Sequence, residues 1–142
     1  MSARVLDGAA VAQTIRRELQ PRVAAVTAKL GRPPGLGIVL VGDNPASEVY
    51  VRNKLRAAAE LGIRADLERL PATATIGDTL ALVTRLNGSP AHDALLVQAP
   101  LPAALGAGAA QRVFDAIDPA KDVDGFSADN VGRLVKKRTG PV

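Results

Sequence analysis

The amino-acid sequence predicts an α/β protein, a three-layer α/β/α sandwich around a mostly parallel sheet. Helical and strand-like segments alternate along the chain in the order α-β-α-β-α-β-α, which is typical of a parallel sheet with helices on both faces. The 142 residues contain no internal repeat and no low-complexity linker, and this length suits one domain with its own core. We therefore expect residues 1–142 to form a single domain.

The first helix is expected from Asp7 to Gly31. Asp7 is a suitable N-cap and Gly31 a suitable terminator, and Pro21 should kink or divide the helix between them. The helical period is carried by apolar residues that recur every three or four positions, namely Val11, Ile15, Leu19, Val23, Val26 and Leu30.

The next three elements follow from composition and from the residues that typically begin or end helices. Residues 35–41 (G-L-G-I-V-L-V) are typical of a buried strand. A helix should begin after Asn44, with Pro45 in the first helical position, and run to about Gly62. Residues 63–70 alternate apolar with charged side chains, which favours a half-exposed edge strand.

The remaining elements are shorter. Thr75, with Asp78 three residues later, predicts the start of a helix that ends near Gly88. Residues 94–97 form a short buried strand, followed by the rigid turn Q-A-P-L-P. The last expected helix covers about residues 107–117 and stops at Asp118-Pro119.

Composition excludes several classes of function. The sequence has no Cys and a single His, His92, which we expect at the surface, so disulfides and a multi-histidine metal site are excluded. No apolar run is long enough to span a membrane, and the first residues do not resemble a signal peptide. We expect a cytoplasmic protein with no metal and no membrane partner.

The net charge of +4 does not by itself indicate nucleic acid. The basic residues are scattered, apart from Lys136, Lys137 and Arg138, and no aromatic residues lie between them to stack bases. We therefore expect no nucleic-acid partner; an acidic small ligand or a coding bias explains the charge equally well.

A ligand site is expected beyond the carboxyl ends of the parallel strands. Two turns lie there, G-D-N-P-A-S after the first strand and Q-A-P-L-P after the third. The segment K-D-V-D-G-F follows the last expected helix and can fold over the same edge.

The helix after Asn44 carries an unusual charge pattern. Glu48, Arg52, Arg56 and Glu60 form one solvent-facing stripe. Tyr50 and Lys54 lie about 160° around the helix from that stripe, so both should face inward. An inward lysine is a usable base when desolvation lowers its pKa, but one that extends its amine to water fits the pattern equally well.

Three other sites each allow a structural and a functional interpretation. Gln98 ends an apolar strand, where it either bonds local backbone or holds a ligand or Lys54. Asp122 and Asp124 share a tight turn, in which carboxylates usually bond their own backbone. The stretch G-A-G-A-A near Gly106 lacks a dinucleotide-binding pattern and most simply begins a helix.

Taken together, three motifs in register resemble the methylenetetrahydrofolate dehydrogenase/cyclohydrolase family. They are V-G-D-N-P-A-S-E-V-Y-V-R-N-K (residues 41–54), L-L-V-Q-A-P-L-P (residues 95–102) and D-P-A-K-D-V-D-G-F (residues 118–126), with N-V-G-R-L (residues 130–134) continuing the match. The resemblance covers essentially the whole chain, in the same order and spacing.

The resemblance implies two reactions of one-carbon metabolism on one folate site: NADP-dependent oxidation of 5,10-methylenetetrahydrofolate, then hydrolysis of 5,10-methenyltetrahydrofolate to 10-formyltetrahydrofolate. It implies that Tyr50 packs on the folate ring, Lys54 activates water or relays protons, Gln98 orients Lys54, and Asp124 binds the pterin. Asp122 would support the loop. The substrate-binding residues it implies are Tyr50, Val97, Gln98, Pro100, Leu101, Asp124 and Gly125.

Two departures from the family lie near the implied cleft. Ala99 stands where the family usually has leucine, and Ala94 where glycine is common. The basic surface would suit a polyglutamylated folate. A homodimer is compatible with the resemblance, although the sequence does not decide the oligomeric state.

The largest departure is the end of the sequence. Family members continue into a dinucleotide-binding domain and a final helix that packs back, whereas this sequence ends at T-G-P-V, with residues 127–142 leading toward the missing domain. No glycine-rich fingerprint for NADP is present, so we expect no cofactor-binding residue here and no dehydrogenase activity from this chain alone. We expect either an excised or truncated domain or a naturally short relative, and a non-catalytic folate-binding or subunit-interaction module stays open as the alternative.

Overall fold

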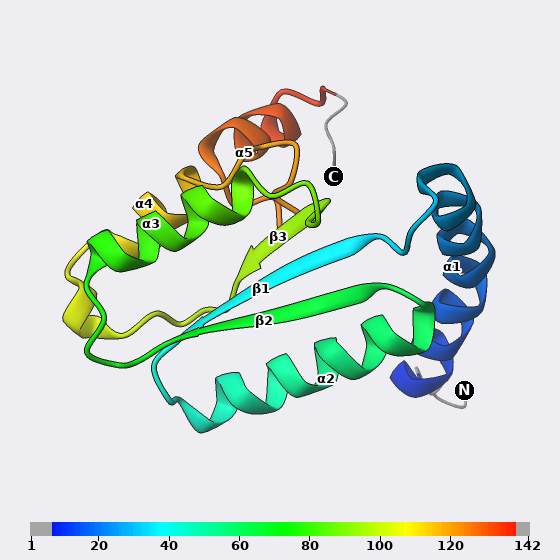
Figure 1. Cartoon of the computed structure of the whole chain (residues 1–142), viewed down its shortest axis with the longest axis horizontal. Coiled ribbons are helices and arrows are strands. Elements are labelled where there is room, and N and C mark those ends of the chain that lie inside the picture. Colours follow the sequence, from blue (N-terminus) through cyan, green and yellow to red (C-terminus); the bar gives the residue numbers. More distant parts are fainter. Residues whose placement is uncertain (1–6, 139–142) are drawn as a thin grey trace, which may run out of the picture.

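A computed structural model describes residues 7–138 of the chain, so residues 1–6 and the T-G-P-V end of the expected domain lie outside the described part. Its centre is a three-stranded parallel sheet in the order β2-β1-β3 (Figure 1). The strands are β1 (Gly35–Val41), β2 (Arg64–Leu70) and β3 (Ala94–Val97). The α/β prediction is confirmed, including the edge position of β2.

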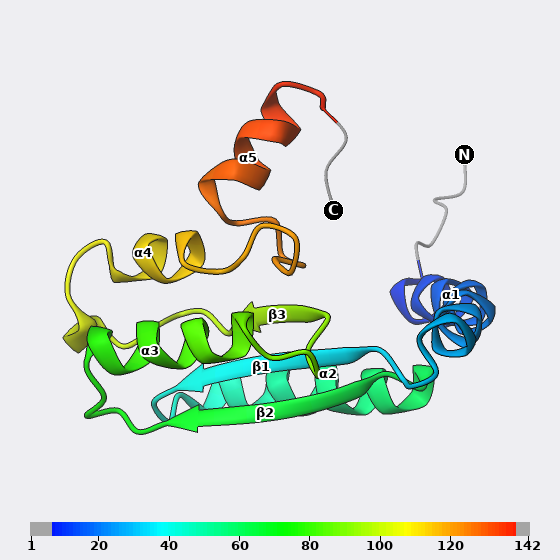
Figure 2. The same cartoon turned by 45° about the horizontal axis from the view of Figure 1, so that its top comes forward.

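Helices cover both faces of the sheet, giving three layers (Figure 2). Helix α2 (Pro45–Leu61) lies on one face, and α3 (Ile76–Asn87) and α4 (Ala109–Asp115) lie on the other. Successive β1 side chains point to opposite faces. As a result, Ile38 and Leu40 join the α2 core, whereas Val39 and Val41 join the α3 and α4 core.

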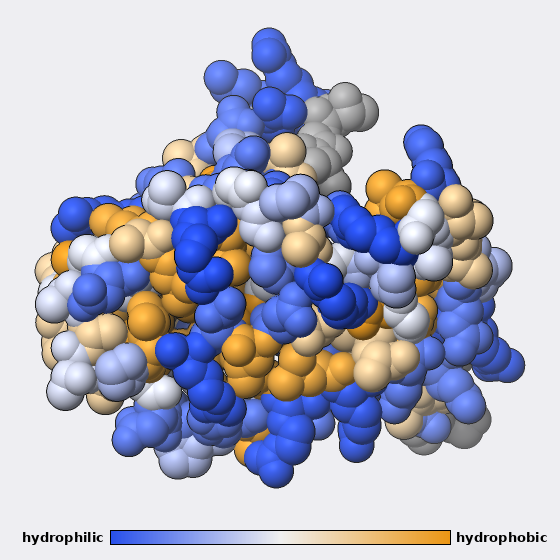
Figure 3. Space-filling view, in the orientation of Figure 1, coloured by the Kyte–Doolittle hydropathy of each residue, from blue (hydrophilic) through white to orange (hydrophobic). Residues whose placement is uncertain are grey.

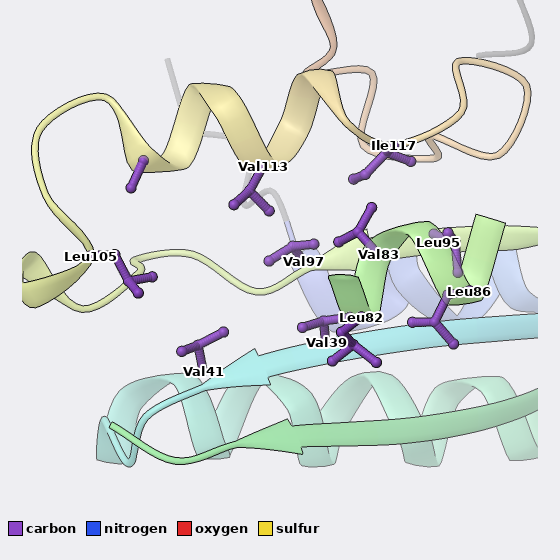
Figure 4. Packing of buried hydrophobic residues seen from close by; sticks show 11 residues of the cluster. Val39, Val41, Leu82, Val83, Leu86, Leu95, Val97, Leu105, Val113 and Ile117 are labelled. Atoms are coloured by element: carbon purple, nitrogen blue, oxygen red, sulfur yellow. The ribbon is translucent and has the colours of Figure 1, made fainter. Parts of the chain in front are cut away.

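The larger of the two cores is built almost entirely from aliphatic side chains. It joins β1 and β3 to α3 and α4, and Figure 4 shows these residues filling the space between the layers. Leu86 and Val113 are completely buried within it, as close packing of an aliphatic core requires. The full set of buried residues is Val39, Val41, Leu82, Val83, Leu86, Leu95, Val97, Leu105, Ala109, Val113 and Ile117.

Local sequence signals explain where the central helices begin and end. The Asn44 side chain accepts hydrogen bonds from the Ala46 and Ser47 amides, so it caps α2 as expected. Thr75 and Asp78 form the predicted capping box at the start of α3. Gly62 ends α2 with a positive φ, a conformation that glycine adopts at little cost.

Helix α1 (Gly8–Leu30) differs from the prediction in one respect. Asp7 caps it and Gly31 ends it in the left-handed conformation, as expected. Pro21, however, does not divide the 23-residue helix. The helix lies beyond one end of the sheet, beside α2 (Figure 1), and none of its residues is buried.

The chain after β3 contains two elements that were not predicted. A 3₁₀ turn (Ala103–Leu105) precedes α4. A further helix, α5 (Ala128–Val135), follows the helix that was expected to be the last one. The Ser127 side chain caps α5 through the Asn130 amide. The prediction that the helix at 107–117 is the last one is therefore wrong, although Ser127 was an available cap signal for a further helix.

The described chain after α5 is basic, whereas the last turn of the helix exposes Leu134 and Val135. In Figure 3, hydrophilic residues project from the top of the view, where α5 and the chain after it lie. Lys136, Lys137 and Arg138 supply its basic charge and are exposed. None of the helices in residues 7–138 is long and apolar enough to cross a membrane.

The amino end of the sheet is closed by polar contacts, and one of them corrects a prediction. His92 was expected at the surface but is only 8% exposed. Its Nε2 lies 3.0 Å from Asp66 Oδ2 on β2, and its ring packs over Gly37, where a Cβ would lie 3.4 Å from the ring. A histidine before a strand gives no sequence signal for this, because its partner Asp66 is 26 residues away on another strand.

Arg32 and Asp93 form a second contact at this end. The Arg32 guanidinium donates to both Asp93 carboxylate oxygens at 2.7 and 2.9 Å, and the Gly35 amide donates to the same carboxylate at 2.8 Å. These bonds, the Arg32 bond foremost, lower the pKa of Asp93 to about 2. Together they tie the turn before β1 to the turn before β3.

We predict that Asp93→Asn lowers the melting temperature by several degrees near neutral pH. Since the folded pKa is lowered, the stabilisation is present above the unfolded pKa of about 3.9 and is lost as pH falls toward about 2. Thermal unfolding followed by circular dichroism at about pH 7 and about pH 2 should therefore show a difference from wild type that shrinks in acid. Asp129→Asn, which removes an exposed pair with Arg133, is the control and should change little.

Candidate active site

The carboxyl ends of β1 and β3 lie side by side, because the two strands pair in parallel with Val39 opposite Val97. The Gln98 amide extends this ladder by donating to the Val39 carbonyl at 2.8 Å. The turn that leads from β1 into α2 and the turn that leaves β3 therefore meet at one edge of the sheet. This is where an open parallel sheet binds its ligands.

Lys54 and Gln98 are in direct contact at this edge. Lys54 Nζ donates to Gln98 Oε1 at 3.1 Å, and Gln98 Nε2 donates to the Ala99 carbonyl at 2.6 Å. Because Gln98 is only 9% exposed and its amino group is already used, its oxygen faces Lys54. The two readings of Gln98, local backbone bonding and contact with Lys54, both hold in the same side chain.

Lys54 is half-buried, and Tyr50 is not. The buried residues of α2 are Ser47, Val51 and Ala58, which form one stripe along the helix. At about 100° per residue, Lys54 lies about 40° around the helix from the centre of this stripe, and Tyr50 lies about 80° from it. Tyr50 is accordingly 62% exposed. The expectation that Tyr50 faces inward is wrong: it lies on the flank of the helix, where its ring is open to a ligand.

The charged stripe of α2 is also modified by tertiary contacts. Arg52, Arg56 and Glu60 are exposed, and Arg56 lies 3.8 Å from Glu60. Glu48 instead is half-buried and pairs with Arg69 of β2. The first member of the stripe therefore fastens the helix to the sheet.

The loop after α4 brings Asp122 and Asp124 to the same region. It pairs with β3 through a parallel bridge between Leu95 and Asp122, with the Leu95 amide donating to the Lys121 carbonyl at 2.7 Å. Because the loop then runs parallel to β3, Asp124 follows on the way toward the Gln98 end. The segment therefore lies along the free edge of β3, and its folding over the ligand edge stays a prediction.

Asp122 is buried and surrounded by hydrogen-bond donors. It is 2% exposed and accepts from the amides of Gly125 and Ser127 at 3.0 and 2.9 Å. Burial alone would raise its pKa, but the hydrogen bonds, led by that of Ser127, outweigh burial and lower the pKa. The side chain thus remains an ionised acceptor that closes the turn.

Asp124 is the exposed member of the pair. Partial desolvation of its carboxyl raises the pKa, the charge of Lys54 opposes this shift, and the charge of Asp122 adds to it. The side chains of Lys54 and Asp124 are therefore close enough to influence each other. The Lys54 amine, the Gln98 amide and a carboxylate with a raised pKa therefore lie at one edge of the sheet.

The other expected substrate contacts are not all equivalent. Pro100 and Leu101 line a cavity of about 360 Å³ that also includes the turn after β1. The Val97 side chain, by contrast, is 2% exposed in the core, so only its backbone can reach a ligand. Gly125 is half-buried with φ of 70°, a conformation that favours glycine.

Two residues that contact Asp122 have a role that the sequence does not predict. Ser127 donates its amide to Asp122, and the Asn130 side chain donates to the same carboxylate at 3.1 Å. The serine three residues before Asn130 was an available signal for the start of a helix. The contact with Asp122 was not, because it depends on how α5 packs.

Residues 7–138 were expected to hold neither a metal nor a dinucleotide, and two features bear on this. They contain no group of three or more side chains that could hold a metal ion. The turn from β1 into α2, G-D-N-P, provides one glycine, the turn from β2 into α3 provides none, and the longer connection from β3 to α4 provides Gly106 and Gly108. A glycine-rich dinucleotide fingerprint places several glycines where a strand turns directly into a helix, and none of these three connections has that pattern.

Comparison with known proteins assigns the family. The model for the catalytic domain of tetrahydrofolate dehydrogenase/cyclohydrolase matches residues 6–124. A bifunctional protein FolD from Acidiphilium cryptum is 55% identical over 134 residues, which are 94% of this chain and 46% of that protein. The chain belongs to the tetrahydrofolate dehydrogenase/cyclohydrolase catalytic-domain family.

Solved structures agree with this assignment. A 5,10-methylenetetrahydrofolate dehydrogenase from the silkworm Bombyx mori is 39% identical with a TM-score of 0.92, over 99% of this chain and 48% of that one. The Trypanosoma brucei dehydrogenase-cyclohydrolase (FolD), complexed with NADP cofactor and inhibitor, is 37% identical with a TM-score of 0.88, over 99% and 47%. The chain thus spans about half the length of the relatives it matches.

We predict that Gln98→Met exposes Lys54. The thioether fills similar space but removes the oxygen that accepts from Nζ, so the amine turns into water and should react several times faster with an amine-directed reagent. Peptide-resolved mass spectrometry measures this. Lys121, whose Nζ donates to the Asn87 and Ser89 carbonyls, is the internal control, and equal labelling of Lys54 in both proteins would contradict the prediction.

Proposed function

We propose that this chain is the folate-handling domain of a methylenetetrahydrofolate dehydrogenase/methenyltetrahydrofolate cyclohydrolase. Its own residues would carry the cyclohydrolase step, which interconverts 5,10-methenyltetrahydrofolate and 10-formyltetrahydrofolate. The observation that supports this most directly is the Lys54–Gln98 contact at the carboxyl end of the sheet. Membership of the family supports the choice of substrate.

The hydrolysis needs water to add to the cationic methenyl carbon and one carbon–nitrogen bond to break. Lys54 accepts the proton that the attacking water loses, and the tetrahedral adduct then releases N5, which takes up a proton. The overall reaction consumes one water and releases one proton. Gln98 holds Lys54 Nζ in place for the transfer, because its oxygen faces the amine.

Asp124 and Tyr50 would bind rather than transfer protons. The Asp124 carboxylate is suited to accept hydrogen bonds from the N–H groups of a pterin. The exposed ring of Tyr50 can pack against the planar part of the folate. Both lie on elements that also carry or approach Lys54, so one ligand can reach all three.

The dehydrogenase step requires a nicotinamide cofactor. NADP is bound in the Trypanosoma brucei relative, and we propose that a dinucleotide-binding domain holds it in the complete enzyme. The strand-to-helix turns of the described residues lack the glycine-rich pattern of such a site, so we assign no part of the hydride transfer to them.

The proposal extends to location and partners. The absence of Cys is compatible with the reducing cytoplasm, and the basic charge of the chain suits a polyglutamylated folate. Apolar side chains are exposed on α1 and α5, including Ile15 at 50% and Leu134 at 78%. A homodimer contact or a second domain would cover such side chains.

We predict that Lys54→Met lowers hydrolysis of 5,10-methenyltetrahydrofolate by about 100-fold or more, the usual contribution of a general base, while tetrahydrofolate binding is retained. The loss of the methenyl absorbance measures hydrolysis, and calorimetry measures binding. Lys29→Met alters an exposed lysine at the end of α1 and should change neither. Binding without turnover in wild type would favour the alternative, a non-catalytic folate-binding or interaction module.

We also predict that the chain alone does not reduce NADP when given 5,10-methylenetetrahydrofolate. The reason is that residues 7–138 lack a glycine-rich turn that could hold the pyrophosphate. Absorbance of the reduced nicotinamide follows the reaction. Turnover near the rate of the full-length relatives would overturn this assignment of the two steps.

A further inference from the structure

Asn130 lies in the first turn of α5 and is 6% exposed. Its side-chain Nδ2 donates two hydrogen bonds, to the Pro119 carbonyl at 2.9 Å and to Asp122 Oδ2 at 3.1 Å. The two acceptors lie where the loop leaves α4 and where it pairs with β3. One amide group therefore joins α5 to both points of the loop.

Asp122 receives this bond together with three backbone bonds. The amides of Gly125, Phe126 and Ser127 donate to its two oxygens at 3.0, 3.4 and 2.9 Å. Along the chain, Asp124 thus lies between Asp122, which bridges to β3, and the three amides that bond the Asp122 carboxylate. The position of the Asp124 backbone depends on the Asp122 carboxylate staying in place.

The side chain of Asn130 is not needed to begin α5. Ser127 is the N-cap, and its hydroxyl accepts from the Asn130 backbone amide at 3.4 Å. In addition, Asn130 Oδ1 is buried and has no hydrogen-bond partner within residues 7–138. Burying an unpaired oxygen carries a cost that an apolar side chain would avoid, so the two Nδ2 bonds are what this asparagine provides.

We propose that Asn130 is a positioning residue for the folate site: it fixes Asp122, and through Asp122 it holds Asp124 at the ligand edge beside Lys54. This inference rests on the proposed function, because it assigns Asp124 to the bound pterin. Asn130 itself does not touch the ligand. Its loss would leave Lys54 and Gln98 in place but free the turn that carries Asp124.

Amide hydrogen exchange followed by NMR tests the first half of the inference without any ligand. In Asn130→Ala, the amides of Gly125, Phe126 and Ser127 should exchange at least about 10-fold faster, because the carboxylate that they bond is released. The control is Asn87→Ala, which removes bonds to the Ala116 carbonyl and the Asp118 amide. Unchanged exchange at residues 125–127 in Asn130→Ala would overturn the inference.

Binding of tetrahydrofolate to the full chain tests the second half. Asn130→Ala should raise the dissociation constant about 5- to 20-fold, the effect expected for losing about one well-placed hydrogen bond. Asn87→Ala should bind tetrahydrofolate as wild type does, even if its melting temperature falls as far as that of Asn130→Ala. Faster exchange with unchanged affinity would overturn the positioning role and leave Asn130 a structural residue.

A variant of the same shape separates positioning from lost packing. Asn130→Asp replaces the donor with a second carboxyl against Asp122. The other charged groups on the segments packed here are Asp115, which accepts from the Ala128 amide, Asp118 and Lys121 of the loop, and Asp129 and Arg133 of α5. Two carboxyls in contact share a proton in acid, which restores a donor. The loss of affinity should therefore be larger at about pH 8 than at about pH 5.5 for Asn130→Asp, and equal at both for Asn130→Ala.

The two proposals fail in different ways. If the wild-type chain does not bind tetrahydrofolate, the proposed function is contradicted, and the assignment of Asn130 to a folate site falls with it. The exchange data then still decide whether Asn130 holds the Asp124 turn. If wild type binds and the Asn130→Asp defect does not depend on pH, only the role of Asn130 is overturned.

Discussion

The structure depends on the burial of β1 on both faces and along both edges. Its side chains alternate between two cores, with Ile38 and Leu40 against α2 and Val39 and Val41 against α3 and α4. Its backbone pairs with β2 on one side and β3 on the other. Because both faces of β1 are apolar, each face needs a covering layer of helices, so the three layers follow from the heptapeptide at residues 35–41.

The two ends of this sheet differ in what their polar side chains do. At the amino end, Gly35 and Gly37 let the turn before β3 approach closely; a Cβ at Gly35 would lie 1.9 Å from the Ala91 carbonyl oxygen. The polar groups there pair with one another, Arg32 with Asp93 and His92 Nε2 with Asp66. At the carboxyl end, Lys54 and Asp124 remain available to a ligand, so one end stabilises the fold while the other can act on a substrate.

The loop from α4 to α5 connects stability with the site. Asp122 is a buried carboxylate whose four donors come from the loop and from α5. A buried charge is tolerated only when it is well paired, and the pairing here also determines where Asp124 lies. The same contacts that stabilise the loop therefore position the carboxylate that we assign to the pterin.

The sequence by itself determined the alternating elements, the parallel sheet, the edge position of β2 and the caps at Asn44 and Thr75, because these depend on periodicity and on short-range hydrogen bonds. It also determined the family, through motifs whose order is independent of packing. Tertiary structure alone decided that Tyr50 lies on the flank of α2, that His92 is buried and that Asn130 bonds Asp122. Each of these depends on which surface packs against which, and a contact between residues far apart in sequence, such as His92 with Asp66, leaves no local pattern.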